Sequence, residues 1–168
     1  MEKIGLFYGS DTGCTETVSE MIKEQMGDAI ELLDVYDVSP EDFKQYDKII
    51  IGLSTWHDGQ LVSAWDDFYD DFKSVDMKGK TVAIFGLGDQ YGYSTYFIDG
   101  VGILGDVVLE NGGKLIGWWP TEGYEHDESK AERDGKFMGL AIDEDNQDEL
   151  TEERVTKWVT QITEEFGL

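Results

Sequence analysis

The fold is decided by one stretch near the N-terminus, Leu6-Phe7-Tyr8-Gly9-Ser10-Asp11-Thr12-Gly13-Cys14-Thr15-Glu16-Thr17. An apolar strand pattern runs directly into a loop rich in hydroxyl groups and glycine, and this loop opens a helix. Successive backbone N–H groups in such a turn, together with the positive end of the helix dipole, can bind a phosphate. An ordinary capped helix start is the competing interpretation, because Ser, Thr and Asp are also common N-cap residues.

The charge of this loop narrows the kind of phosphate it could bind. Between Gly9 and Thr17 there is no Lys or Arg. A Walker loop ends in Gly-Lys-Ser/Thr, and its lysine reaches the outer phosphates of a nucleoside triphosphate. Here only neutral donors are available, so the loop is predicted to hold one terminal monoester phosphate rather than ATP or GTP.

Two further loops follow apolar runs in the same way. Residues 49–53 lead into Ser54-Thr55-Trp56-His57-Asp58-Gly59, and residues 81–85 lead into Gly86-Leu87-Gly88-Asp89-Gln90-Tyr91-Gly92-Tyr93. Trp56 and Tyr93 lie in polar, glycine-containing segments, where a large ring needs something to stack on. They are predicted to face a flat ligand, and two ordinary core aromatics are the competing interpretation.

Strand and helix patterns alternate along the whole chain. Strands are expected at residues 3–8, 30–35, 48–53, 80–85 and 114–118. A short helix is expected to start at Ser39. Longer helices are expected to bury Val18, Met21, Ile22 and Met26; Leu61, Trp65, Phe68 and Phe72; Phe97, Val101, Leu104 and Val108; and Val155, Trp158, Val159, Ile162 and Phe166.

This alternation indicates an α/β fold, with a five-stranded parallel sheet and helices on both faces. In the order 2-1-3-4-5, ligands bind at the carboxyl ends of the strands, beside the first one. All three loops leave such ends, so the fold is expected to bring them together. Residues 122–147 lack clear periodicity and are interpreted as an excursion from the fifth strand.

Length and composition indicate a single domain over residues 1–168. No apolar run approaches the ~20 residues that cross a bilayer, so a soluble protein without membrane insertion is expected. The lone cysteine, Cys14, excludes internal disulfides and fits a reducing compartment such as the cytoplasm. With two histidines, it forms no metal or nucleophile constellation.

The chain is strongly acidic, with 37 acidic and 13 basic residues and a net charge of −24. Such a field repels nucleic acid and anionic lipid, and it attracts partners with basic faces at rates that fall as salt rises. Solubility, or adaptation to a salty interior, would give the same composition.

With these three loops, the chain resembles the flavodoxins along its whole length, and those of photosynthetic microbes in particular. The segments at residues 119–124 and 139–147 look like the borders of the insertion that marks the long-chain subgroup. The resemblance implies a three-layer flavodoxin-like fold with a five-stranded parallel sheet and an insertion in its last strand. It also implies non-covalently bound flavin mononucleotide (FMN).

The positions that match the family's motifs form three groups. The resemblance assigns the phosphate to Ser10, Asp11, Thr12, Gly13, Cys14 and Thr15. It assigns the ribityl chain and one face of the ring to Ser54, Thr55, Trp56, His57 and Gly59. The edge and the other face of the ring are assigned to Leu87, Gly88, Asp89 and Tyr93.

The chain departs from the family pattern in places. Cys14 stands where Asn is common, and it is interpreted as a tolerated loop residue whose N–H still serves. Ser54 stands where related sequences often have Pro, and residues 95–98 replace a more polar run, so contacts there are not carried over. His57 could sense pH or contact a partner, and an exposed histidine without a role is an equally good interpretation.

The resemblance implies a monomeric electron carrier rather than an enzyme. It would be a low-potential one-electron carrier that substitutes for ferredoxin between a donor and an acceptor. The implied partners are redox proteins with basic docking faces, such as ferredoxin-NADP reductase, photosystem I and other ferredoxin-dependent enzymes. The flavin carries the chemistry, and nearby carboxylates such as Asp89 would lower its potential.

Two other functions are alternatives for a chain of this fold. An FMN-dependent NAD(P)H:quinone reductase of this fold is the main alternative, but the chain shows no second nucleotide motif, and its negative field would repel NAD(P)H. A receiver domain would need an acidic pair after the first strand and a phosphorylated Asp after the third. Gly9 and Ser10, and then Ser54 and Thr55, stand at those places.

Overall fold

The computed structural model describes residues 3–10, 13–56 and 59–168, with Trp56 described by its backbone. Asp11, Thr12, His57 and Asp58 lie outside the described residues.

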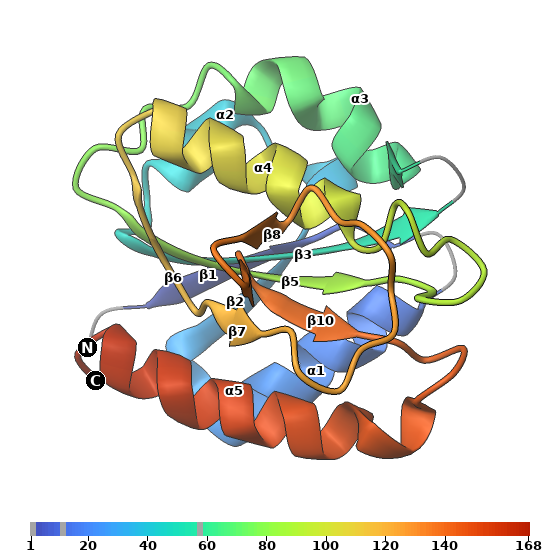
Figure 1. The fold of residues 1–168 in the computed structure, drawn as a ribbon. Coiled ribbons are helices and arrows are strands. Elements are labelled where there is room, and N and C mark those ends of the chain that lie inside the picture. The colour runs from blue at the N-terminus through green and yellow to red at the C-terminus, as the bar shows by residue number, and fades with distance from the viewer. Residues whose placement is uncertain (1–2, 11–12, 57–58) are drawn as a thin grey trace.

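A mostly parallel sheet forms the middle layer of the molecule (Figure 1). Its central path has the order β10-β5-β3-β1-β2, with β4 paired antiparallel to β3 and β6 paired to β5. The strands of this sheet are β1 (Ile4–Tyr8), β2 (Ile30–Asp34), β3 (Lys48–Trp56), β4 (Gln60–Leu61), β5 (Thr81–Leu87), β6 (Lys114–Ile116) and β10 (Leu140–Ile142). The predicted α/β class and the order of the parallel strands are confirmed.

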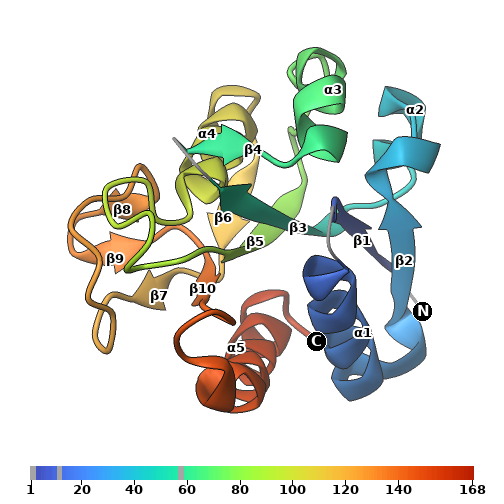
Figure 2. The same cartoon turned by 90° about the vertical axis from the view of Figure 1, so that its right-hand side faces the viewer.

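Helices cover both faces of the sheet. In Figures 1 and 2, α1 and α5 lie on one side of it, and α2, α3 and α4 on the other. Their bounds are α1 (Cys14–Met26), α2 (Pro40–Phe43), α3 (Ser63–Phe72), α4 (Asp99–Glu110) and α5 (Thr151–Glu165). Short 3₁₀ turns follow α1 (Gly27–Ala29) and β2 (Val35–Asp37) and precede α5 (Asp148–Leu150).

The core lies between the sheet and these two helical layers. The middle strands are buried on both faces because helices pack above and below them, which explains their continuous apolar sequence. On the α2 and α3 side, Phe7 stacks on Phe43 with ring centroids 3.9 Å apart. Phe43 of α2 also meets Phe72 of α3, with ring centroids 5.6 Å apart, so aromatic pairs join β1 to α2 and α2 to α3.

The fifth strand is built in two pieces. β6 pairs with the start of β5, and β10 pairs with its end. Between them the chain forms a small antiparallel sheet of β7 (Trp119–Pro120), β9 (Lys136–Phe137) and β8 (Glu132–Arg133), seen beside β10 in Figure 2. A Cβ at Gly139 would lie 2.1 Å from the Ile84 carbonyl oxygen, so the chain can return to the sheet there only with glycine. The predicted insertion in the last strand is confirmed.

Three boundary predictions were wrong. Leu61 belongs to β4 and not to the following helix, because β3 extends to Trp56 and the chain folds back to pair with it. Phe97 is buried but precedes α4, which starts at Asp99. The excursion ends before residue 140, since β10 already belongs to the main sheet.

Candidate functional site

Three loops leave the carboxyl ends of β1, β3 and β5, which are neighbours in the sheet. In a doubly wound sheet this edge is where ligands bind. The arrows of β3 and β5 point to the same side of the molecule in Figure 1. Of the predicted site residues that the structure describes, Ser54, Thr55 and Trp56 are the last residues of β3, and Leu87 is the last residue of β5. The others lie in the loops that follow β1, β3 and β5, or in the first turn of α1.

The loop after β1 is anchored against a buried tryptophan. The N–H of Gly9 donates to the carbonyl oxygen of Gly52 (3.0 Å), which also accepts from Trp65 Nε1 (2.9 Å). A Cβ at Gly9 would lie 2.7 Å from Trp65 Cδ1, so this close approach needs glycine. The path of the loop is therefore fixed before its hydroxyl residues begin.

The start of α1 offers donors next to open space. The N–H of Gly13 donates to Ser10 Oγ (2.9 Å). Among the described residues, no atom beyond the chain neighbours of Gly13 lies within 4 Å of the position that its Cβ would take. The first N–H groups of a helix have no intrahelical acceptor, so those of Cys14 and Thr15 can serve an anion. These neutral donors fit a monoester phosphate.

The first and second loops meet through two buried hydroxyls. Thr15 Oγ1 lies 3.3 Å from Ser54 Oγ, and both side chains are almost wholly inaccessible to water. The next hydroxyl, Thr55 Oγ1, accepts from the N–H of Gly100 (2.9 Å). Ser54 is thus held against the phosphate loop, while Thr55 ties β3 to the first turn of α4.

The second loop ends against a buried carboxylate. Gly59 is buried, and a Cβ on it would lie 2.6 Å from Asp99 Oδ2. Asp99 is 1 % exposed, and its Oδ1 accepts from the N–H of Lys130 (2.8 Å). Burial raises the pKa of Asp99, against the Lys130 hydrogen bond and charge, which lower it.

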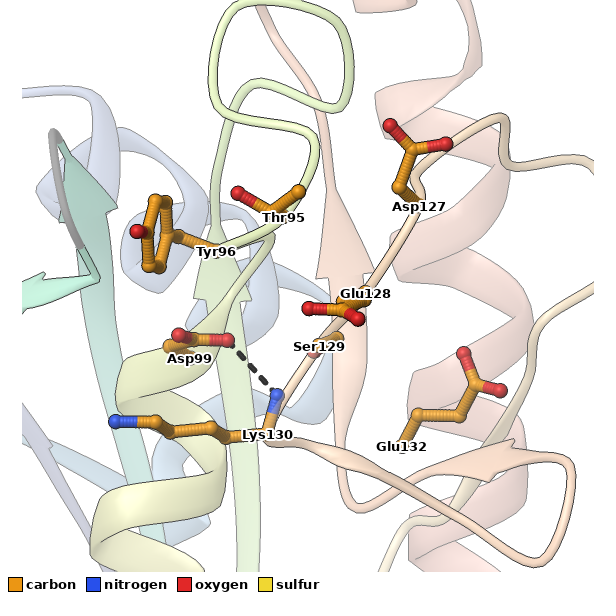
Figure 3. A pocket seen from close by; sticks show the side chains of 8 residues that line it. All are labelled: Thr95, Tyr96, Asp99, Asp127, Glu128, Ser129, Lys130 and Glu132. Atoms are coloured by element: carbon orange, nitrogen blue, oxygen red, sulfur yellow. Dashed lines mark hydrogen bonds between the residues drawn. The ribbon is translucent and has the colours of Figure 1, made fainter.

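Asp99 also lies at the edge of a hollow between the third loop and the insertion, shown in Figure 3. The hollow has a volume of ≈ 470 Å³ and is lined by Thr95, Tyr96, Asp99, Asp127, Glu128, Ser129, Lys130 and Glu132. The figure shows the Asp99 carboxylate directed at the backbone nitrogen of Lys130. This hollow borders the predicted site at Asp99, and four of its eight lining residues are acidic.

The third loop presents its residues in different ways. Leu87 is 1 % exposed and packs in the core, and the N–H of Gly88 donates to the Ile142 carbonyl oxygen (2.9 Å). Tyr93 is half-buried, and its N–H donates to the carbonyl oxygen of Asp89 (3.0 Å). Asp89 and Tyr93 are thus the predicted site residues of this loop whose side chains are partly exposed.

The Asp89 carboxylate is held by three hydrogen bonds. It accepts from the N–H of Gly92 (2.7 Å), the N–H of Tyr91 (3.1 Å) and Asn146 Nδ2 (2.8 Å). Burial alone would raise the pKa of Asp89, but these hydrogen bonds to the charged form outweigh it, and the pKa is lowered. Asp89 therefore carries a full negative charge at neutral pH.

Sequence reasoning missed three polar residues around this edge. Asn146 reaches Asp89 from the segment after β10, Gln90 is fully buried beside it, and Asp99 closes the second loop. Gln90 directly follows Asp89 in the sequence, and Asp99 is the first residue of α4. The burial of both side chains depends on segments that are distant in sequence. No local pattern distinguishes them from exposed polar residues.

The donor set contains no cation. Lys and Arg are absent from the sequence of all three loops, at residues 9–17, 54–59 and 87–93. Within residues 3–10, 13–56 and 59–168, no group of three or more His, Cys, Asp or Glu side chains could hold a metal ion. No helix in that part of the chain is long and apolar enough to cross a bilayer.

Known proteins with similar sequence and structure agree on one family. The model of the flavodoxin family matches residues 6–158. The chain is 53 % identical to a flavodoxin of Picosynechococcus and 46 % identical to flavodoxin 1 of Escherichia coli, over 100 % and 98 % of this chain and 100 % and 94 % of those proteins. A crystal structure of Fusobacterium nucleatum flavodoxin bound to flavin mononucleotide superposes with a TM-score of 0.93, at 32 % identity, covering 98 % of this chain and 99 % of that one. This chain belongs to the flavodoxin family.

Proposed function

We propose that this chain binds one FMN non-covalently at the three loops and carries electrons one at a time between redox proteins. Membership of the flavodoxin family supports the class of function. The observation that carries the proposal is the phosphate loop, in which neutral donors at the start of α1 lie beside open space at Gly13. A terminal phosphate of FMN matches this donor set, and a charged diphosphate would lack a counter-cation.

Each loop is given one part of the cofactor. Ser10, Gly13, Cys14 and Thr15 would hold the phosphate, with Asp11 and Thr12 assigned to the same task by sequence. Ser54, Thr55 and Gly59 would line the ribityl chain. Tyr93 would stack on the ring, as would Trp56 from the opposite side, and the backbone of Leu87 and Gly88 would border its edge. His57 remains assigned to this site by sequence.

The protein's contribution to the chemistry is orientation and charge. Bound FMN supplies the one-electron chemistry. The ionised Asp89 and the acidic residues around the edge disfavour an added electron, and this lowers the reduction potential. A low potential suits a carrier that passes electrons to biosynthetic enzymes in place of ferredoxin.

Charge also supports a choice of partners. A net charge of −24 favours redox proteins with basic faces. Ferredoxin-NADP reductase, photosystem I and other ferredoxin-dependent enzymes are the candidates. The lone cysteine favours work in the cytoplasm, where the chain would act as a monomer. Direct NAD(P)H:quinone reductase activity is not favoured, because the similar curated proteins are named flavodoxins.

Ligand titration of the apoprotein tests this function. Fluorescence quenching of FMN, riboflavin and FAD should show one FMN per chain, bound at least tenfold more tightly than riboflavin or FAD. Equal affinity for FMN and riboflavin would show that the phosphate is not held.

A matched pair of variants locates the phosphate. Thr15→Val removes the hydroxyl beside Ser54 and should weaken FMN binding without changing riboflavin binding. Thr160→Val is the control, because this exposed hydroxyl donates to the Thr156 carbonyl oxygen within α5, away from the loops. A Thr15→Val protein with the parent's affinity for FMN would place the phosphate elsewhere.

A further inference from the structure

The side chain of Gln90 is buried within the third loop, and its amide is fully engaged. Gln90 is 0 % exposed. Its Nε2 donates to Asp143 Oδ2 (2.7 Å) and to Gln147 Oε1 (2.9 Å), and its Oε1 accepts from the N–H of Glu125 (2.6 Å). Both amide hydrogens and the amide oxygen are therefore paired.

The partners of Gln90 all belong to the insertion or to the segment that follows it. Glu125 lies within the insertion, Asp143 follows β10 directly, and Gln147 precedes α5. Gln147 also accepts from Arg154 Nη2 (2.8 Å), whose guanidinium lies over the ring of Tyr124. One buried glutamine thus joins the third loop to the insertion and to the segment that follows β10.

Asp143 also contacts the third loop and the segment that follows β10. It is 0 % exposed and accepts from the N–H of Gln90 (3.1 Å) and from the N–H of Asn146 (3.0 Å). Asn146 Nδ2 bonds to Asp143 and also donates to Asp89 Oδ1 (2.8 Å). The network therefore reaches Asp89, a residue assigned to the edge of the ring, through a single side chain.

Such a network favours one position of the loop. A buried polar group without a partner is costly, so moving the loop away from Asp143 would be opposed by the two buried bonds that Gln90 donates to this carboxylate. The N–H groups of Gly88 and Tyr93 are bonded within the same loop arrangement, to Ile142 and to Asp89. The position of residues 88–93 is therefore set by contacts with the insertion and with the segment that follows β10.

We propose that Gln90 and Asp143 form a buried latch that positions residues 88–93 for the flavin ring. They are positioning residues, which act through Asp89 and Tyr93 without touching the cofactor. The insertion would then influence the cofactor through this latch. This inference rests on the proposed function for its effect on FMN, but the latch itself can be measured without the cofactor.

Amide hydrogen exchange of the apoprotein measures the latch directly. In Gln90→Leu we expect exchange at Gly88 and Tyr93 to be at least tenfold faster than in the parent. Asn111→Leu is the matched control. Asn111 follows the last residue of α4, and its Nδ2 donates to the carbonyl oxygens of Lys73 and Val75, so this variant also removes a side-chain amide that joins two segments. Unchanged exchange at Gly88 and Tyr93 in Gln90→Leu would overturn the latch, whether or not the chain binds FMN.

Titration with FMN and reductive titration measure the consequence for the cofactor. Gln90→Leu should raise the Kd for FMN at least tenfold and shift a midpoint potential, while Asn111→Leu should keep both near the parent values. Faster exchange with the parent's Kd and potentials would overturn the effect on the cofactor. A parent that binds no FMN would instead refute the proposed function, and the exchange result would still decide the latch.

Exchanging the amide of Gln90 and the carboxylate of Asp143 gives a second test, which holds even if Gln90→Leu fails to fold. Gln90→Glu places two carboxylates together at Asp143 and should weaken FMN binding more than Asp143→Asn does. The double variant Gln90→Glu/Asp143→Asn restores one amide facing one carboxylate and keeps the net charge of the parent. It should recover part of the affinity and part of the slow exchange. A double variant no better than Gln90→Glu would overturn the pairing.

Discussion

At the scale of single residues, close contacts fix the loops at the carboxyl ends of β1, β3 and β5 before any ligand binds. Gly9 lies against the indole edge of Trp65, and both groups share the Gly52 carbonyl oxygen as acceptor. Asp99 is buried between Gly59 and Lys130. Each contact joins segments that are distant in sequence, so each can be tested by a change of one or two atoms.

Gly9→Ala should destabilise the protein by about 1–3 kcal/mol, the usual effect of forcing extra volume into a packed site. The new Cβ would lie 2.7 Å from Trp65 Cδ1 and 3.1 Å from the Cβ of Ala64. Urea unfolding of the apoprotein measures the change. In a Trp65→Phe background the same substitution should cost less, because the indole edge is gone, and additive effects of the two changes would contradict the contact.

Asp99→Asn should raise the free energy of unfolding at pH 7 and have little effect near pH ~3.5, below the unfolded pKa of ~3.9. Burial raises the folded pKa of Asp99, with Glu128 acting in the same direction and Lys130 opposing. The ionised form is therefore destabilising, and its cost grows as the pH rises through the folded pKa. Asn keeps the acceptor for the Lys130 N–H. A variant less stable than the parent at pH 7 would show that Asp99 stabilises as an anion.

At the scale of elements, the divided fifth strand determines how the insertion is held. β6 and β10 occupy the two halves of one edge of β5, and the chain between them packs aromatic side chains against Phe97, which precedes α4. Phe137 meets Tyr124 edge to face at 5.3 Å and Phe97 at 5.8 Å. The insertion thus has a small core of its own that is continuous with the main one.

Tyr124→Phe should lower the free energy of unfolding by roughly 1–3 kcal/mol, because buried partners lose their hydrogen bonds. The Tyr124 hydroxyl donates to the Ala141 carbonyl oxygen and accepts from Trp119 Nε1 (3.0 Å). Burial raises the pKa of Tyr124 to about 12, so the parent should keep this phenol protonated in a spectroscopic titration to pH ~11. Tyr91→Phe, at a side chain 58 % exposed, is the control and should be nearly neutral. Equal effects of the two would mean that the hydroxyl of Tyr124 stabilises nothing.

At the scale of the whole molecule, charge dominates. A net charge of −24 on 168 residues produces a strong negative field, and the outer face of α3 contributes exposed acidic residues close to the second loop. Such a field steers a basic partner toward the acidic surface, and it is screened as salt rises.

Electron transfer to a basic redox protein should therefore slow by an order of magnitude or more between ~10 mM and ~500 mM salt. Stopped-flow rates at several ionic strengths measure this. Neutralising Asp66, Asp67 and Asp71 on α3 should flatten the dependence more than neutralising Glu24, Asp28 and Glu164, which lie at helix ends away from the cofactor loops. Equal slopes for the two sets would make the charge a general solubility feature.

Local patterns in the sequence were enough to predict the class of fold and the edge that carries the site. An apolar run or a helical spacing of apolar residues is complete within a few residues. Each parallel strand and each covering helix could therefore be predicted from its own segment of sequence. The hydroxyl groups and glycine of the loop from Ser10 to Thr15, with no Lys or Arg, were enough to predict a phosphate site with neutral donors. The structure places Thr15 of that loop next to Ser54, as the strand order requires.

Tertiary structure alone decided the pairing of distant segments. The return of the chain at Gly139 and the burial of Gln90, Asp99 and Asp143 depend on contacts across dozens of residues. Leu61 becomes a strand residue through a shorter-range contact, its pairing with Thr55 at the end of β3. A polar side chain carries no local mark of whether it will be solvated or enclosed, because that depends on which segment covers it. The sequence was therefore enough to predict a set of cofactor-binding residues, which stay a prediction, while the side chains that hold these loops in place could be identified only in the folded chain.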